Sequence, residues 1–169
     1  MPTNGKETPG PNLSVLLECL IEADVEFVLV GGLAAVVQGA PVTTMDVDIV
    51  YNQSSDNISK LINFLKSVGA IYRRPDDVVI EPREEDLIGK GHALLMTRLG
   101  PLDVLAVIEA EKGYEDLLPH SVEVEFRGHS IQVLDLKTLV DLKESSKDPK
   151  DKQRLPVLRE ALRQLENNK

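Results

Sequence analysis

The sequence is poor in residues on which several common functions depend. It has no tryptophan, only 4% of its residues are aromatic, and it holds a single cysteine, Cys19. Because single-stranded nucleic acids are held by stacking on exposed aromatic side chains, this composition argues against such a platform. Cys19 lies in the apolar run LSVLLECLIEA, so we interpret it as a small buried apolar residue and not as a nucleophile or half of a disulfide. Because aromatic residues are so few, the core is expected to be aliphatic.

The chain also lacks long apolar runs and an excess of positive charge. No run approaches the roughly 20 residues that cross a bilayer, and the polar first ten residues do not resemble a signal peptide, so we expect a cytoplasmic protein without a membrane partner. The 19 Lys and Arg against 28 Asp and Glu give a net charge of −9, which repels nucleic-acid backbones at long range. A local basic patch would be needed to bind one, and we expect acidic neighbours to cancel Arg73, Arg74 and Arg83.

At 169 residues the chain is long enough for one well-filled domain and short for two. We expect a disordered tail over residues 1–11 and a single domain over residues 12–169. Its elements are mixed in order, which predicts an α+β fold: a mixed β-sheet with helices packed on it and a C-terminal helical tail, residues 136–169, that packs back on the sheet. Apolar periodicity and capping residues predict helices at 13–23, 56–68 and 136–145, strands at 26–30, 46–51 and 102–108, and a hairpin formed by VEVEF, RGH and SIQVL.

Two prolines lead to further predictions. HALLMTR and LDVLAVI read as strands joined by a tight turn at Gly100-Pro101. Pro156 should kink or restart the last helix, which follows the polar link SSKDPKDK.

The most informative segment is VGGLAAVVQGAPVTTMDVDIV, residues 30–50. Strand side chains alternate between two faces, so Asp46 and Asp48 share a face, about 7 Å apart along the strand. Charges on a buried-looking strand are costly unless something pairs with them. The apolar segment LDVLAVI holds one acid, Asp103, and as an antiparallel neighbour it would add a third carboxylate. Such clustered oxygens suit Mg²⁺, and two ions about 3.5–4 Å apart could share Asp46 and Asp48 while Asp103 holds one of them.

Gly31 and Gly32 stand where a predicted strand ends and a helix begins. Without Cβ atoms their backbone can approach a ligand closely, and the N–H groups at the start of a helix favour phosphate. A phosphate cradle beside a two-metal carboxylate cluster is the equipment for nucleotidyl transfer. Each feature alone has a plain structural explanation, a turn or an exposed strand edge, and it is the combination that favours a site.

The pattern of Gly31-Gly32, thirteen residues and then Asp-Val-Asp-Ile resembles the signature of the DNA polymerase beta-like nucleotidyltransferase superfamily. More narrowly, VGGLAAVVQGAPVTTMDVDIVY is similar to the small bacterial nucleotidyltransferases that include abortive-infection and toxin–antitoxin toxins. The likeness extends to LDVL around Asp103 and to the tail DLKTLVDLKESSKDPKDKQRL, about residues 13–165 in all. It implies the nucleotidyltransferase fold.

The resemblance implies a role for each matching residue. Gly31 and Gly32 would hold triphosphate oxygens. The catalytic set, which would also bind the metal, would be Asp46, Asp48 and Asp103, with Asp103 helping to deprotonate the acceptor.

The tail motif implies cations at the nucleotide. Lys143 would reach the phosphates, with Lys150 and Asp151 in support, although lysines at a helix end can equally face water. Two positions depart from the pattern: many relatives have serine where this chain has Gly32, and often arginine where it has Val42.

The implied function is an Mg²⁺-dependent enzyme that moves a nucleoside monophosphate from an NTP to a hydroxyl. The acceptor would be an RNA 3′ end, a protein side chain or a small molecule, and the acidic balance weighs against bulky RNA. The protein would then be a candidate toxin with an antitoxin partner. The alternative is a catalytically inactive nucleotide-binding or interaction module of the same fold, which Val42 favours and the intact aspartate trio opposes.

Overall fold

The computed structural model describes residues 11–168, so the predicted disordered tail lies outside the described residues apart from Pro11. Short 3₁₀ helices occur at Glu84–Leu87, Glu109–Glu111 and Leu118–His120. The α-helices within this range are α1 (Leu13–Glu22), α2 (Gly31–Val37), α3 (Ser55–Ser67), α4 (Tyr114–Leu117), α5 (Leu136–Glu144) and α6 (Pro149–Asn167). The strands are β1 (Phe27–Val30), β2 (Val47–Tyr51), β3 (Ile71–Tyr72), β4 (His92–Thr97), β5 (Gly100–Leu105), β6 (Val107–Ile108), β7 (Lys112–Gly113), β8 (Ser121–Phe126) and β9 (His129–Leu134).

A seven-stranded mixed sheet forms the centre, in the order β3-β4-β5-β2-β1-β9-β8, and β6 and β7 form a separate ribbon. This confirms the predicted α+β architecture. β2 runs antiparallel to β1 and parallel to β5, so the expectation of an antiparallel partner carrying Asp103 was wrong. The reason is topological: α3, β3 and β4 intervene between β2 and β5, and β4 takes the antiparallel place on the far side of β5.

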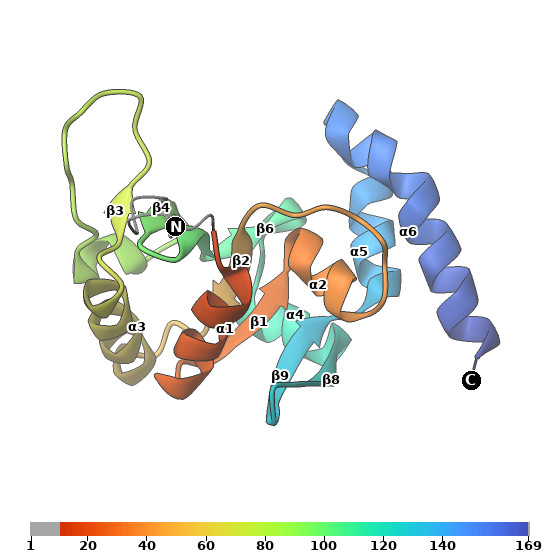
Figure 1. Ribbon diagram of the computed structural model, residues 1–169, viewed down its shortest axis with the longest axis horizontal. Coiled ribbons are helices and arrows are strands. Elements are labelled where there is room, and N and C mark those ends of the chain that lie inside the picture. Colours follow the sequence, from red (N-terminus) through yellow and green to blue (C-terminus); the bar gives the residue numbers. More distant parts are fainter. Residues whose placement is uncertain (1–10, 169) are drawn as a thin grey trace, which may run out of the picture.

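The helices cover the sheet unevenly (Figure 1). α1 contacts β2, α2 contacts β1 and β2, and α5 packs against both α2 and α6. Figure 1 shows α5 and α6 at one end of the long axis and α3 at the other, so the C-terminal helices do not lie across the whole sheet face. The side chains of Leu94 and Met96 on β4 are 44% and 40% exposed, which leaves part of the sheet face without a helix over it.

The helix starts follow the capping residues in the sequence. Asn12, Ser54 and Asp135 accept hydrogen bonds from the first-turn N–H groups of α1, α3 and α5. α6 continues as one helix through Pro156, so the proline does not restart it. Pro156 is exposed, and water can therefore satisfy the carbonyl that loses its helical donor. The turn between β4 and β5 falls at residues 98–99, and Gly100 and Pro101 belong to β5.

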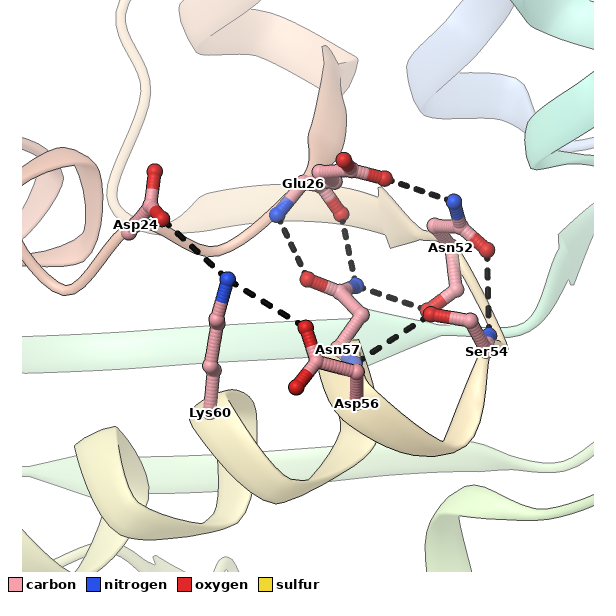
Figure 2. Close-up of polar contacts among 7 residues, drawn as sticks. All are labelled: Asp24, Glu26, Asn52, Ser54, Asp56, Asn57 and Lys60. Atoms are coloured by element: carbon pink, nitrogen blue, oxygen red, sulfur yellow. Dashed lines mark hydrogen bonds and ion pairs between the residues drawn. The ribbon is translucent and has the colours of Figure 1, made fainter.

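Asn57, buried in the first turn of α3, ties three chain segments together (Figure 2). Its Oδ1 accepts the N–H of Glu26 at 2.7 Å, and its Nδ2 donates to the carbonyl oxygens of Glu26 and Asn52 at 2.9 and 2.7 Å. Glu26 precedes β1 and Asn52 follows β2. One side chain therefore fixes the start of β1, the end of β2 and the position of α3.

The core is aliphatic, as the composition predicts, and fully buried leucines such as Leu16, Leu29 and Leu102 dominate it. Cys19 packs against this core but is only partly buried, so its predicted burial is incomplete. None of the helices formed by residues 11–168 combines the length and the apolar character that crossing a bilayer requires.

Candidate active site

Asp46, Asp48 and Asp103 meet on one face of the sheet, at the central strands β2 and β5. Asp48 of β2 and Asp103 of β5 are direct partners in the parallel register, so their side chains share a face. Asp46 lies in the bend just before β2. One carboxylate oxygen from each of the three lies within 4.8 Å of the others.

This crowding changes how the carboxyl groups titrate. Burial is the main cause that raises the pKa of Asp48 to about 8, and the nearby carboxylates of Asp103 and Asp46 add to it, while Lys143 acts in the opposite direction. Burial and Asp103 also raise the pKa of Asp46. The Oδ1 atom of Asp48 is buried and has no hydrogen-bond partner among residues 11–168. A buried oxygen without a partner is costly, which indicates a site completed by something else.

The donor set and the orphaned oxygen fit a divalent cation. Three carboxylates supply the hard oxygen ligands that Mg²⁺ prefers, and the unpartnered Oδ1 of Asp48 is available to one. Without an ion, part of the negative charge is offset by Arg73, whose guanidinium forms an ion pair with Asp103. Arg73 and Arg154 both lower the pKa of Asp46, although burial outweighs them.

The glycine turn closes on the same aspartates. Gly31 begins α2 directly after β1 with φ of +72°, a conformation that disfavours other residues. A Cβ at this position would come within 2.0 Å of Asp48 Oδ2. A Cβ on Gly32 would come within 2.9 Å of the Thr44 hydroxyl and 3.2 Å of Arg154 Nη1. Close approach therefore favours glycine at both positions, and backbone conformation favours it at Gly31.

Lys143 faces the aspartates from α5. Together with Gly31 and Asp48, it lines a pocket of about 120 Å³. The other residues that line this pocket are mostly aliphatic. The ammonium group of Lys143 donates to Asp151 Oδ1 at 2.8 Å, and the two side chains are 22% and 15% exposed. Burial acts to raise the pKa of Asp151, but hydrogen bonds from Lys143 and Ser146 bring it below its usual range. The geometry thus joins Lys143 and Asp151 to the cluster.

Gln38 holds α5 in this position. Its Nε2 donates to the carbonyl oxygens of Ala34 and Leu134 at 2.9 and 2.8 Å, and its Oε1 accepts the N–H of Leu136 at 3.1 Å. One side chain therefore links the end of α2 to the junction of β9 and α5.

The structure places Lys150 differently from the other predicted site residues. It is exposed in the first turn of α6, and it does not line the pockets that contain Gly31. Arg154, one turn further along α6, reaches the glycine turn instead. Helical spacing after Asp151 was the signal that could have identified it.

Arg73 is the second residue that the sequence interpretation missed. The surface pairs of Arg74 with Asp76 and of Arg83 with Asp86 match the expected cancellation by acidic neighbours. Arg73, just after β3, instead reaches Asp103 across β4. Alternation along the chain would have placed the side chains of Tyr72 and Arg73 on different faces. Only the register of β3, β4 and β5, however, brings Arg73 to Asp103.

Comparisons with known proteins rest on structure alone, since no protein-family model and no curated protein sequence matches the chain. TM1012 of Thermotoga maritima, assigned as a nucleotidyltransferase, aligns over 93% of both chains with a TM-score of 0.53 and 19% identity. The lincosamide antibiotic adenylyltransferase LnuA, solved with lincomycin, aligns over 88% of this chain and 94% of its own with a TM-score of 0.58 and 14% identity.

A third match is ANT(2″)-Ia in complex with adenylyl-2″-tobramycin, which aligns over 89% of this chain and 88% of its own with a TM-score of 0.52 and 14% identity. All three share the arrangement of sheet and helices at low identity. The chain therefore has the fold of these solved nucleotidyltransferases.

Proposed function

We propose that this protein is a metal-dependent nucleotidyltransferase, which moves a nucleoside monophosphate from an NTP to a hydroxyl acceptor. The observation that carries the proposal is the convergence of three carboxylates within 4.8 Å beside a glycine turn, on a nucleotidyltransferase fold. Lys143 lines the same pocket as Asp48 and the turn. The carboxylates are complementary in charge to metal ions, and the ammonium group of Lys143 is complementary to the phosphates of an NTP.

Asp46, Asp48 and Asp103 would hold Mg²⁺. The bound metal would supply neutralisation of triphosphate charge and activation of the acceptor hydroxyl. At Gly31 and Gly32 the absence of a Cβ lets Asp48, Thr44 and Arg154 pack against the backbone, and the turn would hold phosphate oxygens beside these groups. Lys143 would offer its ammonium group to the phosphates as a point charge.

The reaction balances with these residues. The acceptor oxygen forms a bond to the α-phosphorus, the bond to the bridging oxygen of the β-phosphate breaks, and pyrophosphate leaves with that electron pair. The acceptor proton passes to a base, for which Asp103 is the candidate because it stands on the side where the sheet face is open.

The surroundings of Asp103 favour a small-molecule acceptor with an apolar part. Leu94 is its direct partner on β4, so the two side chains share a face, and Met96 follows on that face. Both apolar side chains are exposed, at 44% and 40%. Two structural neighbours were solved with lincomycin and with adenylylated tobramycin. RNA and protein acceptors remain as outcomes that the experiment distinguishes.

One observation favours the alternative, a catalytically inactive binding module. Arg73 already pairs with Asp103, and an ion that takes Asp103 as a ligand must compete with that guanidinium. Metal-dependent NTP binding separates the two functions. Thermal shift with each NTP, with and without Mg²⁺, should show stabilisation that requires metal in the wild type and is lost in Asp48→Asn.

The function itself is tested with NTPs labelled at the α-phosphate. The protein is incubated with each NTP, Mg²⁺ and a cell lysate, and the lysate is then separated into small molecules, RNA and protein. We expect label in the small-molecule fraction with wild type and none with Asp48→Asn. Absence of label from all fractions, with NTP binding intact, would support the inactive module. The toxin role implied by the resemblance stays a prediction, which growth arrest on induced expression tests.

A further inference from the structure

Arg154 lies beside the glycine turn although it comes from α6. Its Nη2 donates to the carbonyl oxygen of Thr43 at 2.9 Å, in the loop that leads to the aspartates. Its Nη1 stands 3.2 Å from the position that a Cβ on Gly32 would occupy. It also lines a small pocket with both glycines of the turn and Lys143. α6 therefore brings a guanidinium against the turn that the proposed function assigns to the triphosphate.

Among the described residues, Arg154 has no acidic partner at ion-pair distance, although the carboxylates of Asp46 and Asp151 lie near enough to interact with its charge. Arg159 and Arg163 on the same helix pair with Glu144 and Glu160, whereas Arg154 forms no ion pair within residues 11–168. Its side chain is nevertheless partly buried. Withdrawing a cation from water without a partner costs free energy, so its surroundings are suited to an anion that arrives from outside.

The other cations at the cluster are already engaged. Lys143 is held by Asp151 at 2.8 Å, and Arg73 is paired with Asp103 on the opposite side of the cluster. Arg154 is the cation at the glycine turn that an incoming anion meets without first displacing a carboxylate. This arrangement separates a phosphate side, where Arg154 lies, from the open sheet face next to Asp103.

We infer that Arg154 binds the triphosphate of the NTP and so makes α6 part of the nucleotide site, an inference that rests on the nucleotidyl transfer proposed above. Guanidinium donors form strong, directional hydrogen bonds to phosphate oxygens. Nη2 is engaged by Thr43, so Nη1, which faces Gly32, is the nitrogen left to meet an oxygen. Because the glycine turn is the phosphate cradle, the contact belongs to the β- and γ-phosphates, which a nucleoside monophosphate lacks.

Isothermal titration of the full chain with each of the four NTPs and the matching NMPs, in Mg²⁺, tests this. Arg154→Ala and Arg154→Gln both remove the charge, and Gln keeps a donor for Thr43. Arg163→Ala, an exposed arginine on the same helix, is the matched control. We expect the Kd of the preferred NTP to rise about tenfold or more in both Arg154 variants, since a hydrogen bond to a charged group is lost. NMP affinity should stay within about twofold, and Arg163→Ala should match the wild type.

Other results would overturn the inference in distinguishable ways. Unchanged NTP affinity in Arg154→Gln, with circular dichroism like that of wild type, would show that the guanidinium does not touch the triphosphate. Equal weakening of NTP and NMP would show that Arg154 only positions α6. Should the wild type bind none of the four NTPs, the proposed function itself would fail and this inference with it.

Discussion

The carboxyl group of Asp48 has two properties that disfavour its charged form in the metal-free protein. It is largely withdrawn from water, and it stands beside two other carboxylates. Both properties favour the protonated form, and the pKa of about 8 records their combined effect. Residues that destabilise their own charged form in this way are typical of functional sites.

The pH dependence of stability follows from that pKa. Unfolded, Asp48 titrates near 3.8, and folded, near 8, so between these values the folded state binds the proton more tightly. Stability contributed by this group is therefore lost as pH rises through this range. In EDTA, Asp48→Asn should be more stable than wild type by on the order of 2 kcal/mol at pH 8.5 and by much less at pH 5. Urea unfolding at both pH values measures this.

Asp86→Asn serves as a control because the pKa of Asp86 is shifted in the opposite direction to that of Asp48. The backbone N–H of Arg83 is the main cause that lowers the pKa of Asp86, and Tyr72 adds to it. Its stabilising contribution is lost only as pH falls below the usual range of aspartate. Asp86→Asn should therefore be destabilised equally at pH 5 and pH 8.5. A stability difference for Asp48→Asn that is equally flat would contradict the assigned pKa.

Gly31 and Gly39 separate backbone strain from steric contact. Both have positive φ, at +72° and +99°, but a Cβ on Gly39 would meet nothing within 4 Å, whereas one on Gly31 would strike Asp48. Gly39→Ala should cost about 1–2 kcal/mol of unfolding free energy. Gly31→Ala should cost more and should also weaken Mg²⁺ binding, because Asp48 must move. Equal costs in chemical denaturation, with Mg²⁺ binding unaltered in both, would show that Asp48 tolerates the methyl group.

At the scale of elements, Asn57 fixes α3 to the ends of β1 and β2 (Figure 2). Asn57→Ala leaves the N–H of Glu26 and two carbonyl oxygens without their side-chain partner, so we expect a loss of about 2–4 kcal/mol in unfolding free energy. Asn63→Ala, exposed on the same helix, should change it by less than about 0.5 kcal/mol. Urea denaturation of both variants checks this, and similar midpoints would mean that packing alone places α3.

Local signals in the sequence predict where helices and strands lie better than they predict which strands pair and in which direction. The caps Asn12, Ser54 and Asp135 and the alternation around Asp48 are readable because each depends on a few neighbouring residues. The pairing of β5 with β2 is not, because a parallel or antiparallel neighbour would place Asp103 on the same face equally well. Direction follows from where the intervening helix and strands pack.

At the scale of the whole molecule, the same limit applies to the site. The sequence pattern identifies the aspartates and glycines because their spacing is fixed within single strands and turns. Arg73 and Arg154 belong to the cluster only through long-range packing, across β4 in one case and over α2 and α5 in the other. Lys150 and Arg154 lie one turn apart on α6: helical spacing after Asp151 points to Arg154, but only the packing of α6 shows that Lys150 stays exposed.

Because two of its cations, Lys143 and Arg154, come from helices at one end of the molecule, the site should couple nucleotide binding to the order of those helices. A ligand that binds only the folded, docked arrangement slows the local opening of the elements it contacts. We expect Mg²⁺ and the preferred NTP to slow hydrogen exchange in α5 and in the first turns of α6, which carry Lys143 and Arg154. α3, at the opposite end of the long axis in Figure 1, is the internal control. The matching NMP should protect α6 less, because it does not reach Arg154. Equal protection of α3 and α6, or none in α6, would show that the C-terminal helices stand apart from the nucleotide.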